Sequence, residues 1–139
     1  EFANLRAQKE SRSLDNLLLF NEIDSREIPG LLAQCDVGLV ALHPEHKTHN
    51  IPGKFVSYMQ YGLPVLARVN PGTDLIRLIE QQDVGRVYVG NEVDELRALA
   101  EELADNTFLR HSMSGRGKAL GKAMFSPHAA ARQIVASLD

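Results

Sequence analysis

The stretch that indicates the fold is His49-Asn50-Ile51-Pro52-Gly53-Lys54-Phe55-Val56-Ser57-Tyr58-Met59-Gln60-Tyr61-Gly62-Leu63-Pro64-Val65. It predicts a loop, a short helix and the start of a buried strand. Pro52 suits a first helical turn, because the N–H that it lacks would be unpaired there. Gly62 suits the left-handed residue that ends a helix, and Pro64 blocks any continuation of that helix.

This helix carries a lysine close to its beginning. Phe55, Tyr58 and Met59 lie three to four residues apart and can face a core, whereas Lys54 and Ser57 lie on another side. The first N–H groups of a helix are unpaired, and the helix dipole is positive at that end. Together with the ammonium group of Lys54, these features favour an anion, and they predict a phosphate-binding helix N-terminus.

The composition is that of an ordinary globular protein. The 139 residues are enough for one domain over residues 1–139, with 44% hydrophobic and 24% charged residues. A net charge of −3 without a basic run argues against a nucleic-acid partner. Cys35 is the only cysteine, which excludes an internal disulfide and a cysteine-rich zinc site. We expect a cytoplasmic location, because no segment has the roughly 20 apolar residues that span a bilayer, and no signal-peptide pattern opens the chain.

Short apolar runs predict four strands that are buried on both faces, at residues 17–20, 37–42, 65–69 and 86–89. Strands that alternate with amphipathic helices indicate an α/β fold. Right-handed crossovers then favour a Rossmann-like, doubly wound parallel sheet with helices on both faces and a helical C-terminal region. No strand precedes the helix expected at residue 2, so we expect the chain to be a piece of a longer protein.

Helical spacing predicts the segments between these strands. One helix is expected to be capped by Ser25 and to end at Cys35, which would be a small core residue. Another is expected to be capped by Thr73 or Asp74. From Glu92 the pattern is helical to the end of the chain.

Ligands of parallel α/β sheets bind outside the carboxyl ends of the strands. Three loops are expected at that edge, at residues 21–24, 43–53 and 70–73. Arg68 and Asn70 come at the carboxyl end of a strand and are expected to face the crevice. Gly72 and Thr73 form a second helix start that suits an anion.

Several motifs, taken in chain order, carry a resemblance to a known family. They are Cys-Asp-Val-Gly-Leu-Val at 35–40, the histidine-rich loop, Ile-Pro-Gly-Lys-Phe-Val-Ser-Tyr-Met-Gln-Tyr-Gly-Leu-Pro-Val-Leu-Ala at 51–67, Asn-Pro-Gly-Thr at 70–73 and Phe-Ser at 125–126. With these motifs, the chain from Leu17 onward resembles the C-terminal half of a glycosyltransferase family 4 enzyme of GT-B architecture. Within that family it looks closest to O-antigen enzymes that transfer N-acetylfucosamine or a related amino sugar.

The resemblance implies half of an enzyme. In the family, the C-terminal domain binds the nucleotide-sugar donor, expected here to be a UDP-linked amino sugar. An N-terminal domain, absent here, carries the binding site for a lipid-linked or oligosaccharide acceptor. Through that domain the enzyme would also lie at the inner face of the membrane. The family retains anomeric configuration and typically needs no metal or other cofactor, which fits a chain without an Asp-x-Asp pair. The implied role is synthesis of bacterial lipopolysaccharide, O-antigen or another surface polysaccharide.

Two positions depart from the family pattern. Where the family usually has two glutamates eight residues apart, this chain has His49 and Ser57. The second glutamate usually binds the ribose hydroxyls, for which serine offers a shorter, neutral hydrogen bond. A second reading therefore stays open, that of a non-catalytic Rossmann-like binding or regulatory domain that has lost nucleotide-sugar binding. A nicotinamide-binding domain is disfavoured, because no Gly-x-Gly-x-x-Gly follows a strand.

Each candidate residue of the donor site has an expected role. Lys54 would contact the diphosphate, although an exposed helix lysine is the alternative reading. Residues 50, 51 and 53 would offer backbone N–H groups, Ser57 would face the ribose, and His49 would touch the sugar or phosphate. The base would rest against residues 23 and 24. The spacing of His43, His46 and His49 does not favour a metal site, and no catalytic residue is indicated. The full set is Lys54, His49, Asn50, Ile51, Gly53, Ser57, Ile23, Asp24, Asn70, Gly72 and Thr73.

Overall fold

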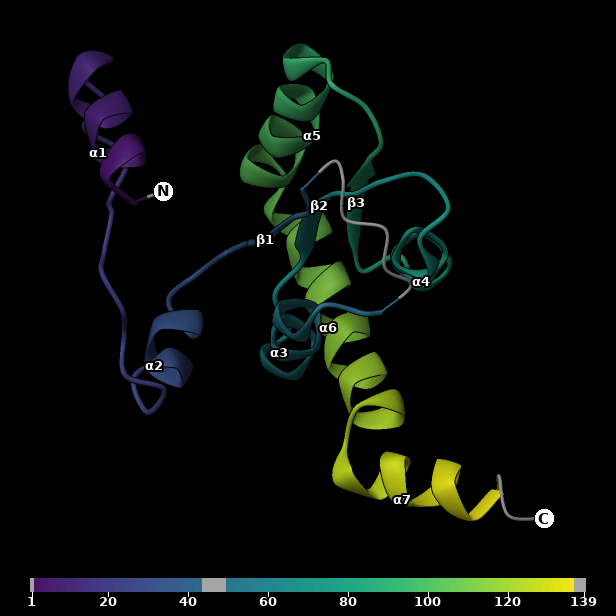
Figure 1. Ribbon diagram of the computed structural model, residues 1–139. Coiled ribbons are helices and arrows are strands. Elements are labelled where there is room, and N and C mark those ends of the chain that lie inside the picture. The colour runs from purple at the N-terminus through teal and green to yellow at the C-terminus, as the bar shows by residue number, and fades with distance from the viewer. Residues whose placement is uncertain (1, 44–49, 137–139) are drawn as a thin grey trace. The chain divides into compact units, whose positions relative to one another are not determined.

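The computed structural model describes residues 2–43 and 50–136, and Figure 1 shows the order of its elements. They are α1 (Phe2–Ser11), α2 (Ile28–Leu32), β1 (Gly38–Ala41), α3 (Gly53–Tyr61), β2 (Val65–Arg68), α4 (Asp74–Gln82), β3 (Gly85–Tyr88), α5 (Val93–Asp105), α6 (Thr107–Met124) and α7 (Pro127–Ala136). The chain divides into two compact units, Glu1–Leu31 and Leu32–Asp139. The second unit contains the sheet.

The first unit contains α1 and an extended segment. The helix α1 buries none of its residues. The strand predicted at residues 17–20 is wrong, because this segment has no regular secondary structure. Leu18 and Phe20 are 69% and 63% exposed. A short apolar run becomes a strand only beside another strand that pairs with its backbone, and the described sheet consists of β1, β2 and β3 alone.

The helix α2 is shorter than predicted. Ser25 does not cap it; instead the carboxylate of Asp24 accepts a hydrogen bond from the N–H of Arg26, at 2.9 Å, and the helix begins at Ile28. It ends at Leu32, so Cys35 lies in the turn before β1 rather than on a helical face. The prediction that Cys35 is a core residue is therefore wrong, because its side chain is exposed.

The sheet of the second unit has three parallel strands in the order β1-β2-β3. Gly38 pairs with Val65, which pairs with Gly85 on its other side. Three of the four predicted strands are thus confirmed, each within two residues of its predicted bounds. The predicted burial of β1 on both faces is wrong, because this edge strand alternates between buried and exposed positions and Leu39 is 54% exposed.

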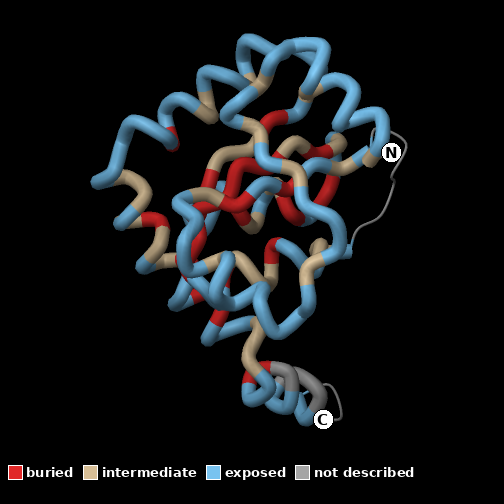
Figure 2. Tube along the Cα trace, turned by 90° about the vertical axis from the view of Figure 1, so that its left-hand side faces the viewer, coloured by how far each residue is buried: buried red, intermediate tan, exposed pale blue. Residues whose placement is uncertain are grey.

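Two apolar clusters lie against opposite faces of the sheet. Alternate residues of β2, Val65 and Ala67, belong to the larger cluster together with residues of α3 and α4. Leu66, between them, belongs to a smaller cluster with Leu103 of α5 and Met113 of α6. Successive side chains of a strand point to opposite faces, so α3 and α4 cover one face and α5 the other. Figure 2 shows that the buried positions concentrate in the strands and in the helix faces beside them.

The helix α3 ends at Gly62 as predicted, but it begins at Gly53, one residue after Pro52, which the sequence predicts in the first turn. Pro52 is its N-cap residue, and Gly62 ends it with a φ of 70°. The N–H of Leu63 then donates to the carbonyl of Tyr58 at 2.8 Å. Phe55 and Met59 are fully buried. Because β1 precedes this helix and β2 follows it, the stretch 49–65 connects two neighbouring parallel strands.

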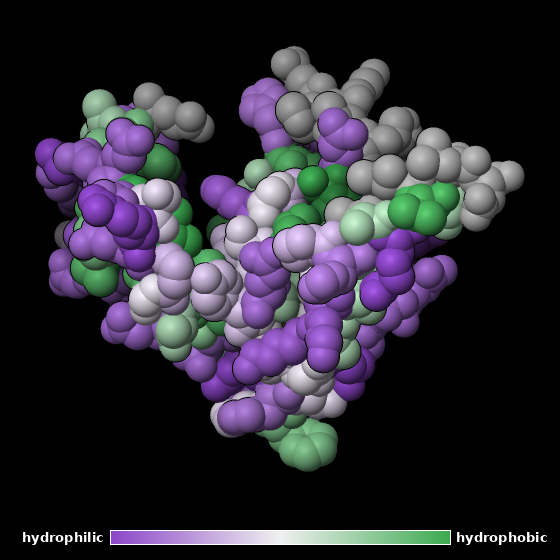
Figure 3. Space-filling model, turned by 90° about the horizontal axis from the view of Figure 1, so that it is seen from below, coloured by the Kyte–Doolittle hydropathy of each residue, from purple (hydrophilic) through white to green (hydrophobic). Residues whose placement is uncertain are grey.

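The C-terminal region is helical, as predicted, with breaks at residues 106 and 125–126. The side chain of Asn106 caps α6 by accepting from the N–H of Leu109 at 2.9 Å. The helix α7 turns away from the end of α6 (Figure 1), and its Ala129 is buried. The face shown in Figure 3 is mostly hydrophilic, with apolar side chains exposed in small separate groups.

Candidate functional site

The candidate site lies at the carboxyl edge of the sheet, where α3 follows β1 and α4 follows β2. Both helices pack on the same face, because Phe55 of α3 and Leu75 of α4 belong to one apolar cluster. Their N-termini therefore lie at the same edge and on the same side. The first N–H groups of both helices are directed to this edge, and both dipoles are positive there. This arrangement favours an anion with more than one charged group.

Lys54 lies in the first turn of α3 and is exposed. Among the described residues, no carboxylate forms an ion pair with it. Gly53, one residue earlier, has open space where a Cβ would lie, so a ligand can approach its backbone closely. Asn50 is exposed, and Ile51 packs against the core beneath the turn. Ser57 is half-buried on the next turn of the helix.

The N-terminus of α4 adds a buried hydroxyl group. Thr73 is the N-cap residue of α4 and only 9% exposed, yet its Oγ1 makes no hydrogen bond in the described part of the chain. The N–H of Ile76, which such a side chain often binds, donates to the Thr73 carbonyl instead, at 3.2 Å. Gly72 before it has a φ of 82°, in the left-handed region. Leaving a buried hydroxyl unpaired costs about 1–3 kcal/mol, which makes Thr73 a suitable ligand contact.

Arg68 and Asn70 are placed at this edge, as predicted, but their polar groups are bound within the protein. The guanidinium group of Arg68 donates to the Leu42 carbonyl at 3.0 Å and to Asn91 Oδ1 at 2.9 Å. It also donates to Asn70 Oδ1 at 3.3 Å, and the amide of Asn70 donates to the His43 carbonyl at 2.9 Å. The sequence gives no sign that Asn91 takes part, because a Gly-Asn pair indicates only a turn.

The structure does not bring three of the predicted residues to this edge, because they fall outside the described part of the second unit. His49 lies outside the described residues. Ile23 and Asp24 belong to the first unit, where Arg26 binds the Asp24 carboxylate at 2.7 Å. The hydrogen bonds from Arg26 lower the pKa of Asp24. Within residues 2–43 and 50–136, no three His, Cys, Asp or Glu side chains gather so as to hold a metal ion.

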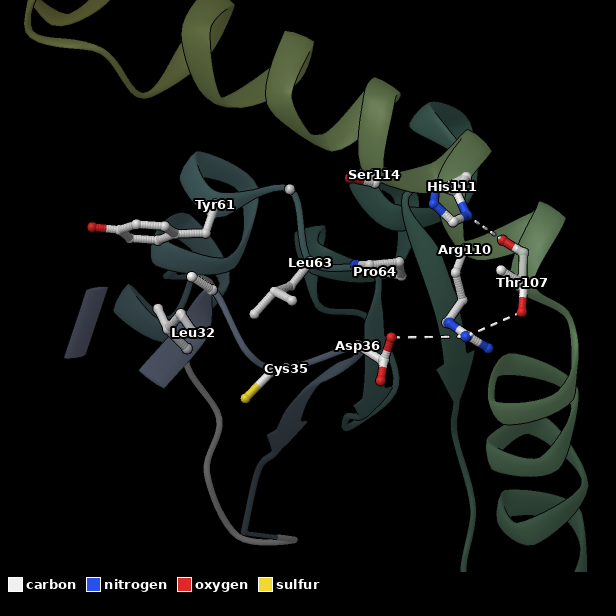
Figure 4. A pocket seen from close by; sticks show the side chains of 12 residues that line it. Leu32, Cys35, Asp36, Tyr61, Leu63, Pro64, Thr107, Arg110, His111 and Ser114 are labelled. Atoms are coloured by element: carbon white, nitrogen blue, oxygen red, sulfur yellow. Dashed lines mark hydrogen bonds and ion pairs between the residues drawn. The ribbon is translucent and has the colours of Figure 1, made fainter. Parts of the chain in front are cut away.

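A cavity of about 250 Å³ lies at the opposite, amino edge of the sheet (Figure 4). Asp36 before β1, Pro64 before β2 and Arg110 of α6 help to line it. Arg110 Nη1 donates to the carbonyl oxygen of Leu103, at 2.8 Å, near the end of α5, and its Nη2 lies 3.7 Å from the carboxylate of Asp36. Its guanidinium group thus caps α5. Because ligands of parallel sheets bind at the carboxyl ends of strands, we place the candidate site at the other edge.

A scan against protein-family models finds none that matches this chain, and a search of curated proteins finds no match either. No helix in the described ranges has the length and apolar character needed to cross a membrane.

Proposed function

We propose that this chain is the donor-binding domain of a retaining, metal-independent glycosyltransferase of family 4. In this proposal, the three-stranded sheet and its helices are part of a Rossmann-like, doubly wound domain, the C-terminal half of a GT-B enzyme. The donor is a UDP-linked sugar, with an amino sugar of the N-acetylfucosamine type as the first candidate. The reaction belongs to the synthesis of bacterial O-antigen, lipopolysaccharide or another surface polysaccharide.

One observation carries the proposal. The N-termini of α3 and α4 lie on the same side of the carboxyl edge of the sheet, and Lys54 is exposed in the first turn of α3. A diphosphate has two charged groups, so it suits two helix N-termini and one ammonium group. The oxygen atoms of the diphosphate would accept from the backbone N–H groups near Gly53 and from Lys54. Ser57, three residues after Lys54, would then face the ribose.

The same groups would assist the chemical step. When the bond between the sugar and the diphosphate breaks, negative charge grows on the leaving diphosphate. Lys54 and the helix dipoles stabilise this charge in a fixed geometry, which lowers the barrier without a metal ion. The acceptor, whether lipid-linked or an oligosaccharide, and the residues that act on it belong to a separate N-terminal domain in this proposal. The chain alone should therefore bind the donor weakly and transfer no sugar.

Calorimetric titration with UDP tests the proposal. We expect millimolar binding of UDP that weakens as the salt concentration rises, because phosphate contacts with exposed cations are screened. Replacing Lys54 by alanine should weaken binding about tenfold, the effect of one charge-assisted hydrogen bond. Lys122→Ala is the matched control, because Lys122 is exposed in the last turn of α6. It should leave UDP binding unchanged.

The outcome also separates the two readings of the sequence. If the chain releases no heat with UDP at millimolar concentration, the donor site is absent. That result would support the alternative, a non-catalytic Rossmann-like domain that has lost nucleotide-sugar binding. Titration with NAD tests the nicotinamide alternative in the same instrument. Equal losses of UDP affinity in the Lys54→Ala and Lys122→Ala variants would show that binding depends on net charge rather than on the N-terminus of α3.

A further inference from the structure

The guanidinium group of Arg68 links the segments that follow all three strands. Arg68 is the last residue of β2, the central strand, and is half-buried. Its Nη1 donates to the carbonyl of Leu42, which follows β1, and its Nη2 donates to the carbonyl of Gly90 at 3.2 Å and to the side chain of Asn91, which follow β3. The Arg68 side chain thus forms hydrogen bonds with the segments that follow both neighbouring strands, β1 and β3.

Asn70 extends this network. Its Oδ1 accepts from Arg68 at 3.3 Å, and its Nδ2 donates to the carbonyl of His43 at 2.9 Å. Asn70 lies three residues before Thr73, where α4 is capped, and His43 follows the strand that leads to α3. The network therefore joins the two residues directly after β1, the residues between β2 and α4, and the turn before α5.

The acceptors of Arg68 are all neutral. They are two backbone carbonyls and two side-chain amides, and the described carboxylates include none within ion-pair distance of Arg68. A planar guanidinium group presents five N–H donors in fixed directions, which allows it to bind several acceptors at once. A lysine at this position would keep the charge but not the directions. Substitution by lysine therefore separates the two properties of Arg68, because it removes the bridging hydrogen bonds and keeps the positive charge.

We propose that Arg68 is a positioning residue for the donor site, one that holds the segments after β1, β2 and β3 at fixed spacing through Leu42, Asn70 and Asn91. This inference rests on the proposed function, since the site it serves is the anion site formed by the N-termini of α3 and α4. Arg68 does not contact the donor. Its effect on donor binding passes through the arrangement of the two helix starts, whose N–H groups bind both phosphates only when their separation matches the diphosphate.

The first test uses amide hydrogen exchange of the free chain. In Arg68→Lys and Arg68→Ala, amide exchange should rise about tenfold at residues 42–43, at residues 70, 72 and 73, and at residues 90–92, the result of losing two or more hydrogen bonds. Exchange within β2 and α3 should stay unchanged. Arg97→Lys is the control, because the ion pairs of Arg97 within the described ranges are with two exposed carboxylates of its own helix, Asp94 and Glu101. Unchanged exchange at the three segments in Arg68→Lys would overturn the proposal.

The second test is UDP titration of the same variants. Both Arg68→Lys and Arg68→Ala should weaken UDP binding about tenfold, because the proposal requires the bridging hydrogen bonds and not the charge. If Arg68→Lys shows faster amide exchange in the segments after the three strands but binds UDP as tightly as the wild type, the positioning role is overturned. If Arg68→Ala does not fold, Asn91→Ala, which removes a single acceptor, should give about a threefold loss of affinity.

The two proposals fail in different ways. If the wild-type chain binds no UDP, the proposed function falls, and with it the role of Arg68 in donor binding, while the exchange result still decides whether Arg68 fixes the three segments. If the wild-type chain binds UDP and the variants bind equally well, only the role of Arg68 falls.

Discussion

Gly121 of α6 lies directly against the backbone of Met59 of α3. A Cβ atom at position 121 would lie 3.0 Å from the carbonyl oxygen of Met59 and 3.2 Å from the N atom of Gln60. Since backbone atoms cannot turn away as a flexible side chain can, a side chain at this position would force α6 and α3 apart by a few tenths of an ångström. The glycine costs helix propensity, but it allows α6 to approach the helix that carries Lys54.

Replacing Gly121 by alanine should therefore destabilise the protein. We expect a loss of about 1–3 kcal/mol in the free energy of unfolding, the usual effect of overpacking a tight contact. Gly115→Ala is the matched control, because Gly115 is exposed on α6 and a Cβ there would meet nothing within 4 Å. It should raise the free energy of unfolding by up to about 1 kcal/mol, through helix propensity alone. Urea denaturation measures the free energy of unfolding of both variants. Equal changes in Gly121→Ala and Gly115→Ala would disprove the close contact between Gly121 and the backbone of Met59.

The hydroxyl group of Tyr88 fixes the start of α5. Tyr88 is the buried last residue of β3, and its hydroxyl accepts a hydrogen bond from the backbone N–H of Glu92, the N-cap residue of α5. Tyr88→Phe should lower the free energy of unfolding by about 1 kcal/mol and raise the exchange rate of the Glu92 amide. Tyr61→Phe serves as control, because Tyr61 is 40% exposed at the end of α3. An unchanged Glu92 amide in Tyr88→Phe would contradict this role.

The ion pair between Glu102 and Arg86 predicts a pH dependence of stability. Arg86 of β3 donates from Nε and Nη2 to the two carboxylate oxygens of Glu102 on α5, at 2.8 Å each, and these bonds lower the pKa of Glu102. A lowered pKa in the folded state means that the stabilisation is present above the ordinary pKa, about 4.5, and is lost as the pH falls through the folded-state pKa. Stability should therefore decline below about pH 4.5.

The Glu102→Gln variant tests this dependence. It should be less stable than the wild type at pH 7 by about 0.5 kcal/mol, since the pair is partly exposed, and the difference should shrink toward pH 3. In Glu101→Gln the effect should be smaller, because Glu101 lies 3.6 Å from Arg97 on the exposed side of α5. A wild-type minus Glu102→Gln difference that stays constant from pH 7 to pH 3 would contradict the assignment.

The sequence alone predicts the parts of the fold that local patterns determine. The strands near residues 37–42, 65–69 and 86–89 and the helix between Pro52 and Gly62 are confirmed, because apolar runs bounded by proline and glycine leave few alternatives. The segment 17–20 has an equally apolar pattern, but it is no strand in the structure. Pairing depends on a neighbouring strand, which a local pattern does not contain.

The candidate site is predicted only in part for the same reason. The helix start that carries Lys54 follows from local sequence, since a lysine just after Pro-Gly at a helix start is a local feature. The network of Arg68 does not follow, because Leu42, Asn70 and Asn91 come together only through the register of three strands. A single sequence likewise does not show that Thr73 Oγ1 is buried without a hydrogen-bond partner among the described residues, because burial there depends on how α4 packs on the sheet.

Thr73 offers the sharpest test of the site, because removing its hydroxyl group should weaken UDP binding without lowering the stability of the fold. Valine has nearly the shape of threonine and lacks the hydroxyl group. Since the Oγ1 of Thr73 is buried and makes no hydrogen bond with the described residues, Thr73→Val should leave the free energy of unfolding unchanged or raise it by about 1 kcal/mol. If this hydroxyl binds the donor, the same variant should weaken UDP binding by about three- to tenfold, the effect of one neutral hydrogen bond.

The control for this variant is Thr107→Val at the start of α6. The Oγ1 of Thr107 accepts a hydrogen bond from Arg110 at 3.3 Å, so its loss should lower the free energy of unfolding by about 0.5 kcal/mol and leave UDP binding unchanged. Urea denaturation gives the free energy of unfolding of each variant, and calorimetry gives its affinity for UDP. A fall in stability in Thr73→Val would show that its hydroxyl already has a partner within the protein. Unchanged UDP affinity would remove Thr73 from the donor site and leave the N-terminus of α3, with Lys54, as the diphosphate contact.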